Sequence, residues 1–144
     1  MTQFSLPGKH IYPITIIESH LDTLGHVNHA IYLMLFEKAR TEMIKERGFA
    51  DLLDIQETGI SPIVLEVNLK FRKELLLHQK VMITTEVHSY SKRIAIISQE
   101  IKDDEDTLCC IAKFKFGLFN LKKRRLIQLT PDWFEALGIS TESH

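Results

Sequence analysis

Apolar and polar side chains alternate with a period of two residues in the middle of the chain. Odd positions are apolar and even positions are mostly polar, as Ile63, Leu65, Val67, Leu69 and Phe71 alternate with Val64, Glu66, Asn68, Lys70 and Arg72. Successive side chains of a strand point to opposite faces, so this pattern predicts a strand with one buried face. Comparable patterns predict strands over residues 81–88, 94–102 and 108–119, and a first strand over 11–18, where Pro13 suits a sheet edge.

Short polar connectors separate the later strands. They are SYSK at residues 89–92 and DDED at 103–106, and connections this short favour antiparallel neighbours. The run KKRR at residues 122–125 lies between two apolar segments. We interpret it as a charged hairpin turn rather than a nucleic-acid patch, because a four-residue charge run is weak evidence for such a patch.

A helical pattern runs from Ala30 to Arg47. Asn28 suits the N-cap position, and Gly48 suits the position after the last turn. The first half of the helix is apolar nearly all round and the second half is charged, so we expect the helix to begin enclosed and to emerge into water. Residues 50–59 are looser and have room for a short helix.

The order of elements is a strand, a long helix and then several antiparallel strands. This order predicts an α+β architecture with one antiparallel sheet packed over one enclosed helix. The chain has 144 residues, of which 44% are hydrophobic and 26% are charged. These values are typical of one globular domain, so we expect a single domain over residues 1–144.

Charge and composition narrow the range of partners. Eighteen basic and nineteen acidic residues give a net charge of -1, which argues against nucleic acid as a partner. The N-terminus lacks the features of a signal peptide and no apolar run reaches membrane-spanning length, so we expect a cytoplasmic protein without membrane insertion. The adjacent Cys109 and Cys110 suit neither zinc nor an ordinary disulfide, and we expect buried thiols.

Polar side chains concentrate where the first strand gives way to the helix. They are His20, Asp22, Gly25, His26, Asn28 and His29. If Asn28 caps the helix, backbone N–H groups beginning near His29 are free to stabilise a developing oxyanion. Gly25 allows a tight turn that would bring the Asp22 carboxylate to the same carbonyl. These two parts together favour hydrolysis of an electrophilic carbonyl compound.

Two other interpretations of this segment stay open. Asp22 and Asn28 are also the residue types that serve as an ordinary turn and cap. His20, Asp22, His26 and His29 offer ligands for zinc or iron, but no H-E-x-x-H or comparable spacing supports a metal site. The chain contains no G-x-S-x-G, G-x-x-x-x-G-K-[ST] or G-x-G-x-x-G motif. We therefore expect neither a metal nor a cofactor.

The segment HLDTLGHVNHAIYLMLFEKAR resembles a known family pattern. It is similar to H-L-D-x-x-x-H-V-N-N-x-x-Y-L-x-x-x-E-x-A-R of bacterial long-chain acyl-CoA thioesterases, within the 4-hydroxybenzoyl-CoA thioesterase-like hotdog superfamily. Weaker likeness continues through VLEVNLKFRKELLLHQKV and FKFGLFNLKKRRLIQL. The resemblance implies a hotdog fold, in which an antiparallel sheet wraps around one long central helix, and assembly as a homodimer or homotetramer.

The resemblance also implies roles for individual residues. Asp22 falls on the catalytic aspartate, His26 and Asn28 fall on the H-V-N triplet, and the backbone N–H of His29 falls on the amide that polarises the carbonyl. At His29 the chain departs from the second asparagine of the long-chain enzymes and is similar to the Tol-Pal-associated thioesterases. The implied reaction is hydrolysis of medium- to long-chain fatty acyl-CoA to fatty acid and coenzyme A, with Asp22 as general base or nucleophile.

Binding of such a substrate needs an apolar groove and cations for phosphate. We expect the turn at Gly25 and the side chains of Tyr32, Leu33 and Phe36 to line the groove. Each of these three side chains also suits an ordinary hydrophobic core. For the phosphates we expect Lys70, Arg72 and Lys73, or the turn at Lys92 and Arg93, although each also suits a solvated sheet edge.

Three alternatives to this function stay open. An acyl-acyl-carrier-protein thioesterase resembles the chain in the D-x-x-x-H-V-N-N segment. A non-catalytic acyl-binding module is compatible with the same fold, because one fold hosts many functions. A hotdog dehydratase is less favoured, since its catalytic histidine lies in a different local setting.

Overall fold

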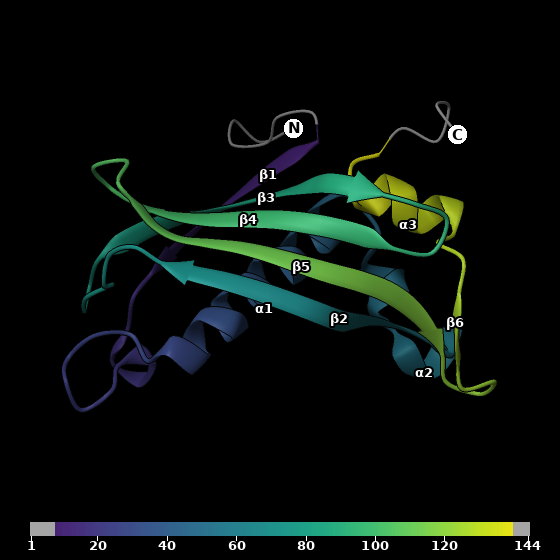
Figure 1. Ribbon diagram of the computed structural model, residues 1–144, viewed down its shortest axis with the longest axis horizontal. Coiled ribbons are helices and arrows are strands. Elements are labelled where there is room, and N and C mark those ends of the chain that lie inside the picture. Colours follow the sequence, from purple (N-terminus) through teal and green to yellow (C-terminus); the bar gives the residue numbers. More distant parts are fainter. Residues whose placement is uncertain (1–7, 140–144) are drawn as a thin grey trace.

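The computed structural model describes residues 8–139. Short turns and loops connect the strands and helices, and 3₁₀ turns lie at Glu18–His20 and Ala50–Leu53. The named elements are β1 (Lys9–Thr15), α1 (His29–Glu46), α2 (Ile55–Thr58), β2 (Ile60–Phe71), β3 (Lys80–Tyr90), β4 (Ala95–Asp103), β5 (Leu108–Asn120), β6 (Arg125–Ile127) and α3 (Pro131–Ala136). Figure 1 shows one curved sheet with α1 lying along one of its faces.

Every strand pairing in the sheet is antiparallel, as the short connectors predict. The strand order is β1-β3-β4-β5-β2, and β6 pairs with β5. Residues 121–124 form the turn between β5 and β6, so the KKRR run lies in and beside a hairpin turn. Pro13 lies on the edge strand β1. The structure thus confirms an α+β architecture with one antiparallel sheet over one long helix.

Local capping signals explain the bounds of α1. The side chain of Asn28 accepts the N–H of Ala30 at 2.8 Å, which satisfies one of the free donors at the helix start. The helix ends before Gly48, whose φ of 90° is the left-handed conformation that glycine adopts without steric cost. Both caps are as the sequence predicts.

The burial of α1 differs from the sequence-based expectation. Met34 in the first half is 64% exposed, whereas Ala39, Met43 and Ile44 in the second half are buried. One face of the helix packs on the sheet along its whole length, and Phe36 meets Phe114 of β5 edge to face at 5.8 Å between ring centroids. The expectation of a buried first half and a solvated second half was therefore wrong.

The edge strand β2 also departs from its predicted pattern. A bulge at Leu65 shifts the register, so that Val64 pairs with Phe116 and Val67 pairs with Phe114. Val64 and Val67 consequently point to the same face, and the alternation of residues 63–71 changes phase. Within this chain Val67 remains 41% exposed and Phe71 52% exposed. Leu69 on the same face is partly buried against the core, so the prediction of one buried face holds only in part.

Both cysteines are buried in β5, as expected. Burial raises the pKa of Cys110 to about 12, so its thiol stays protonated at neutral pH. Among the helices that the structure describes, none combines the length and apolar composition needed to cross a membrane.

Candidate active site

The loop before α1 folds back on itself as a tight hairpin. The Gly25 N–H donates to the Asp22 carbonyl at 3.2 Å, and the Asp22 N–H donates to the His26 carbonyl at 3.0 Å. Gly25 has a φ of 87°, a conformation that strains any residue with a Cβ. The Asp22 carboxylate accepts the Leu24 N–H through Oδ1 at 2.8 Å, which fixes its direction in the turn. Asp22 therefore lies on a rigid loop directly before the helix.

Asn28 determines which donors remain free at the start of α1. Its side chain accepts the Ala30 N–H, and its own carbonyl accepts the Ile31 N–H at 2.9 Å. Within residues 8–139, no acceptor is hydrogen-bonded to the N–H of His29. This N–H lies at the positive end of the helix dipole. It is therefore the donor at the helix start that remains available to a ligand.

A cleft of about 520 Å³ joins the Asp22 loop, the start of α1 and the end of β2. Asp22, His26 and His29 line it together with Tyr32, Arg72 and Lys73. Its remaining wall is formed by Leu24, Val27, Phe71 and Glu74. Six of the residues singled out in the sequence thus lie around one cleft, although they come from two separate stretches of the chain, residues 22–32 and residues 72–73.

The imidazole of His26 lies between two carboxylates. Its Nδ1 is 3.9 Å from Asp22 Oδ2, and its Nε2 is 3.7 Å from Glu74 Oε2. Both separations are too long for hydrogen bonds, but a protonated His26 would be attracted to both groups. Glu74 was missed by the sequence analysis, because it follows β2 in a connector with no pattern of its own.

Tyr32 forms part of the aromatic wall of the cleft, and its hydroxyl stays protonated at neutral pH. Tyr32 is buried and contacts Phe71 edge to face at 5.0 Å. Burial is the largest cause that raises the pKa of Tyr32 to about 12. At neutral pH this hydroxyl is therefore no base.

The cations at the cleft differ in their availability. Lys73 Nζ is hydrogen-bonded to the buried carboxylate of Asp103 at 3.0 Å, and that contact raises the pKa of Lys73. Among the described residues, the Arg72 guanidinium has no hydrogen-bonded or ion-paired partner, so it is the more available of the two. Lys70 lies on the other face of β2 from Phe71 and does not line the cleft.

Other side chains from the sequence analysis lie outside the cleft. Phe36 is fully buried in the core, and Leu33 is exposed. Arg93 lies in the β3–β4 turn, where its Nη1 donates to the Leu126 carbonyl at 3.3 Å. Lys92 belongs to the same turn and accepts the Leu129 N–H through its carbonyl. Their places agree with packing or surface roles rather than with substrate contact.

The proposed metal ligands do not gather around one point. His20 accepts the Ile17 N–H through Nδ1 at 3.1 Å, and burial lowers its pKa. Within residues 8–139, no group of three or more histidine, cysteine, aspartate and glutamate side chains is placed to hold a metal ion.

Comparison with known proteins gives a consistent family. Residues 19–137 match the model of the Thioesterase-like superfamily. The long-chain acyl-CoA thioesterase FadM of Escherichia coli (strain K12) is 26% identical over 119 residues, which are 82% of this chain and 89% of that protein. A DHNA-CoA thioesterase structure from Staphylococcus aureus superposes with a TM-score of 0.81 at 27% identity, covering 89% of this chain and 87% of the other. The likeness to hotdog thioesterases confirms the expected fold.

Some relatives have a name from a different class of enzyme. Xanthine phosphoribosyltransferase of Staphylococcus aureus (strain Newman) is 30% identical over 131 residues, covering 77% of this chain and 68% of that protein. The superposition on a thioesterase over nearly the whole chain argues against a shared activity with that relative.

Proposed function

The chain belongs to the thioesterase-like superfamily, and on that premise we propose that it hydrolyses medium- to long-chain fatty acyl-CoA in the cleft at Asp22. Thioester hydrolysis as such is the activity by which its relatives are named. The observation that carries the proposal is the placement of a fixed carboxylate beside a free N–H at a helix start. Hydrolysis of a thioester needs a group of each kind.

In the proposed mechanism the thioester carbonyl oxygen accepts the N–H of His29. As water attacks the carbonyl carbon, Asp22 takes its proton, and negative charge develops on the oxygen held at the helix dipole. The C–S bond then breaks, and the coenzyme A sulfur leaves with the proton that Asp22 returns. In the alternative route the Asp22 carboxylate attacks the carbonyl carbon, the C–S bond breaks and the coenzyme A thiolate leaves, which forms a mixed anhydride. Water then hydrolyses the anhydride to the fatty acid, which regenerates the Asp22 carboxylate and supplies the proton that the thiolate takes up.

The rest of the cleft supports the same substrate. Tyr32 and Phe71 provide an apolar wall for the first part of the acyl chain. Arg72, exposed and without an anionic partner among the described residues, suits a phosphate of coenzyme A. His26 and Asn28 act through position: Asn28 keeps the His29 N–H free, and His26 lies beside the Asp22 carboxylate.

The edge strand β2 supports assembly as a homodimer. It is 12 residues long, and Val64, Leu65, Val67 and Phe71 are exposed along it, a combination that soluble proteins usually cover. If two copies pair antiparallel around Asn68, then Glu66 lies opposite Lys70 of the partner subunit. The two subunits then form two Glu66–Lys70 charge pairs and bring their exposed apolar side chains together. Lys70 therefore has a role at the interface.

The experiment that tests the function is a release assay for free thiol. Acyl-CoA donors of graded chain length are compared with benzoyl-CoA and with the same acyl groups on acyl carrier protein. The proposal predicts the highest kcat/KM for medium- or long-chain acyl-CoA. Preference for acyl carrier protein or for the aromatic donor would contradict the substrate proposal, and no turnover of any donor would favour an acyl-binding module.

A further inference from the structure

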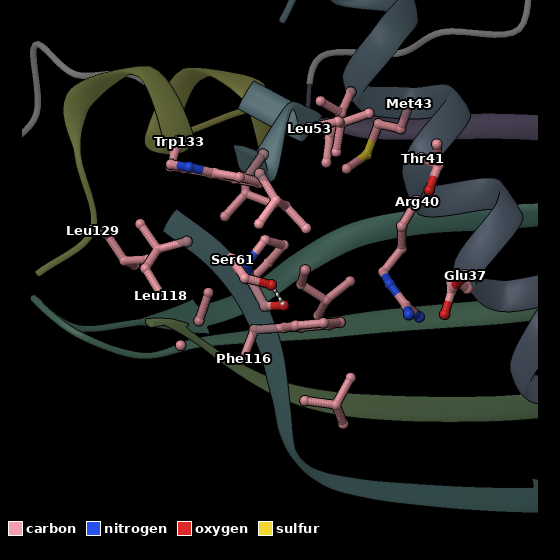
Figure 2. Close-up of a pocket in the computed structure, with 18 residues that line it drawn as sticks. Glu37, Arg40, Thr41, Met43, Leu53, Ser61, Phe116, Leu118, Leu129 and Trp133 are labelled. Atoms are coloured by element: carbon pink, nitrogen blue, oxygen red, sulfur yellow. Dashed lines mark hydrogen bonds between the residues drawn. The ribbon is translucent and has the colours of Figure 1, made fainter. Parts of the chain in front are cut away.

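A cavity of about 350 Å³ lies at the other end of α1 from the Asp22 cleft of the same chain. It is bounded by the second half of α1, the start of β2 and α3. Figure 2 shows its walls, which are apolar over most of their extent and include Met43, Leu53, Phe116, Leu118, Leu129 and Trp133. In Figure 1, α2, β6 and α3 gather at this end, and the loop before α1 lies at the other.

The cavity has an open end and a closed end. Glu37 and Val64 line the open end, and both are exposed. The closed end is lined by side chains that are at most 8% exposed, namely Leu118, Leu129, Trp133 and Leu137. Figure 2 shows Arg40 and Glu37 on one side of the cavity and Trp133 and Leu129 on the other. A ligand that enters beside Glu37 therefore extends toward Trp133.

Arg40 lies at the open end and is held against its wall. Its Nη1 donates to Gln99 Oε1 at 2.9 Å, and its guanidinium carbon lies 4.3 Å from the ring centroid of Phe114 and 4.7 Å from that of Phe116. Val64 pairs with Phe116 in the neighbouring strand, so it lies at the same end as Arg40. Burial lowers the pKa of Arg40 to about 10, so the guanidinium stays charged at neutral pH. An apolar tail is therefore better accommodated beyond Arg40, toward the closed end.

The open end meets the partner subunit in the proposed pairing of β2. Val64 and Arg72 are each four residues from Asn68, so Val64 lies opposite Arg72 of the partner subunit. Because Arg72 lines the Asp22 cleft, each cavity adjoins the Asp22 cleft of the other subunit. In the proposed function, the cavity then receives the distal part of the acyl chain of a thioester bound in that cleft.

The helix α3 is anchored at both ends, which fixes Trp133 at the closed end. Thr130 Oγ1 accepts the Trp133 N–H at 3.3 Å and caps the helix. Near the other end, Nη1 of Arg47, the residue that follows α1, donates to the Ala136 carbonyl at 3.0 Å. The indole is 5% exposed and belongs to the same apolar cluster as Leu118. A tail that reaches Trp133 therefore meets a packed wall rather than a mobile one.

We propose that Trp133 sets the longest acyl chain that the protein accepts, a specificity that rests on the proposed function and on the proposed pairing of β2. Each methylene that enters the apolar cavity should raise kcat/KM about fourfold. The gain ends where the tail meets the indole, because a longer chain either distorts the packed wall or leaves methylenes in water. Trp133 is thus a specificity-determining residue that contacts the end of the substrate farthest from the reacting carbonyl.

The test compares chain-length profiles of the native protein and three variants. The thiol-release assay gives kcat/KM for saturated donors from hexanoyl-CoA to stearoyl-CoA in steps of two carbon atoms, all below micelle formation. Trp133→Ala should move the maximum to a chain at least one step longer. Phe134→Ala is the matched control and should leave the maximum unchanged, because Phe134 packs on Tyr90 at 5.6 Å between ring centroids and does not line the cavity.

Ala95→Leu keeps the proposal testable if Trp133→Ala does not fold. Ala95 is fully buried and lines the cavity from β4, so a larger side chain there should move the maximum to shorter chains. Circular dichroism shows which variants are folded. An unchanged maximum in either folded cavity variant, or an equal shift in Phe134→Ala, would overturn the proposal.

Binding of S-alkyl-CoA thioethers separates this proposal from the proposed function. These analogues lack the carbonyl group and cannot be hydrolysed, so titration calorimetry measures the preferred chain length whatever the activity. The lowest Kd should occur at a longer alkyl chain in Trp133→Ala than in the native protein. This shift without turnover of any acyl-CoA would support the role of Trp133 and contradict the proposed hydrolysis. Turnover without the shift would overturn the role of Trp133 alone.

Discussion

The side chain of Asn28 accepts the N–H of Ala30 at 2.8 Å, and this contact decides what the start of α1 presents to the cleft. The cap takes the N–H of Ala30 and leaves that of His29 for a ligand. In the proposed mechanism, stability and catalysis therefore depend on Asn28 for different reasons, and two substitutions at this position separate them.

Replacing Asn28 by alanine or by aspartate should give different results. Asn28→Ala removes the cap and should lower the free energy of unfolding by about 1 kcal/mol. Asn28→Asp keeps a capping oxygen and should retain stability, but its negative charge near the developing oxyanion should lower kcat. Urea denaturation and the thiol-release assay measure the two effects. Native kcat in Asn28→Asp would show that no negative charge develops near this helix start.

Gly25 and Gly48 form a matched pair. Both have positive φ, 87° and 90°, and a Cβ added to either meets no atom within 4 Å. Alanine at either position should cost about 1–2 kcal/mol through backbone strain alone. Because Gly25 shapes the loop that holds Asp22, only Gly25→Ala should also lower kcat/KM beyond its effect on stability. Equal activity of the two variants would contradict a role for this turn in catalysis.

Stability should depend on pH through Asp103. Hydrogen bonds from the Thr107 N–H and from Lys73 lower the pKa of this carboxyl below its ordinary value of 3.8. Its contribution to stability is therefore fully present above pH 3.8 and is lost as the pH falls through the lower pKa of the folded state. In urea denaturation, the difference between the native protein and Asp103→Asn should shrink as the pH falls below 4. A difference that stays constant down to acid unfolding would contradict this assignment.

A charge exchange tests the proposed pairing of β2. Glu66→Lys and Lys70→Glu each place like charges opposite each other across the two-fold axis, whereas the double variant restores both pairs. Each single variant should weaken the dimer by roughly 1 kcal/mol for two symmetry-related pairs, or about fivefold in Kd, and the double variant should recover native affinity. Sedimentation equilibrium measures these constants. Additive weakening in the double variant would exclude the register centred on Asn68.

The sequence predicts features whose causes are local. Asn28 and Gly48 bound α1 because caps depend on only a few neighbouring residues, and the hairpin turn at residues 121–124 follows from a charged run between apolar segments. The helix α3 carried a comparable signal in Thr130, whose Oγ1 accepts the Trp133 N–H, followed by Pro131 at the first helical position. That signal was present in the sequence and was missed.

Features that depend on distant partners could not be predicted in this way. The bulge at Leu65 exists only relative to β5, so the alternation placed Ile63 on the wrong face, whereas Val67, Leu69 and Phe71 share one face as predicted. Arg40 and Gln99 are 59 residues apart, and nothing near either one indicates the other. The resemblance at residues 20–40 indicated the loop and the helix start, whereas Glu74 and Phe71 reach the cleft through the path of β2 across the sheet.

The most direct test of the account compares the native protein with Asp22→Asn in the thiol-release assay with the preferred acyl-CoA. Asparagine keeps an oxygen that accepts the Leu24 N–H, so the loop and the unfolding midpoint should be unchanged. The missing base or nucleophile should lower kcat by about 100- to 10,000-fold. A folded Asp22→Asn variant with native kcat would show that hydrolysis does not depend on the Asp22 carboxylate and would contradict the central claim.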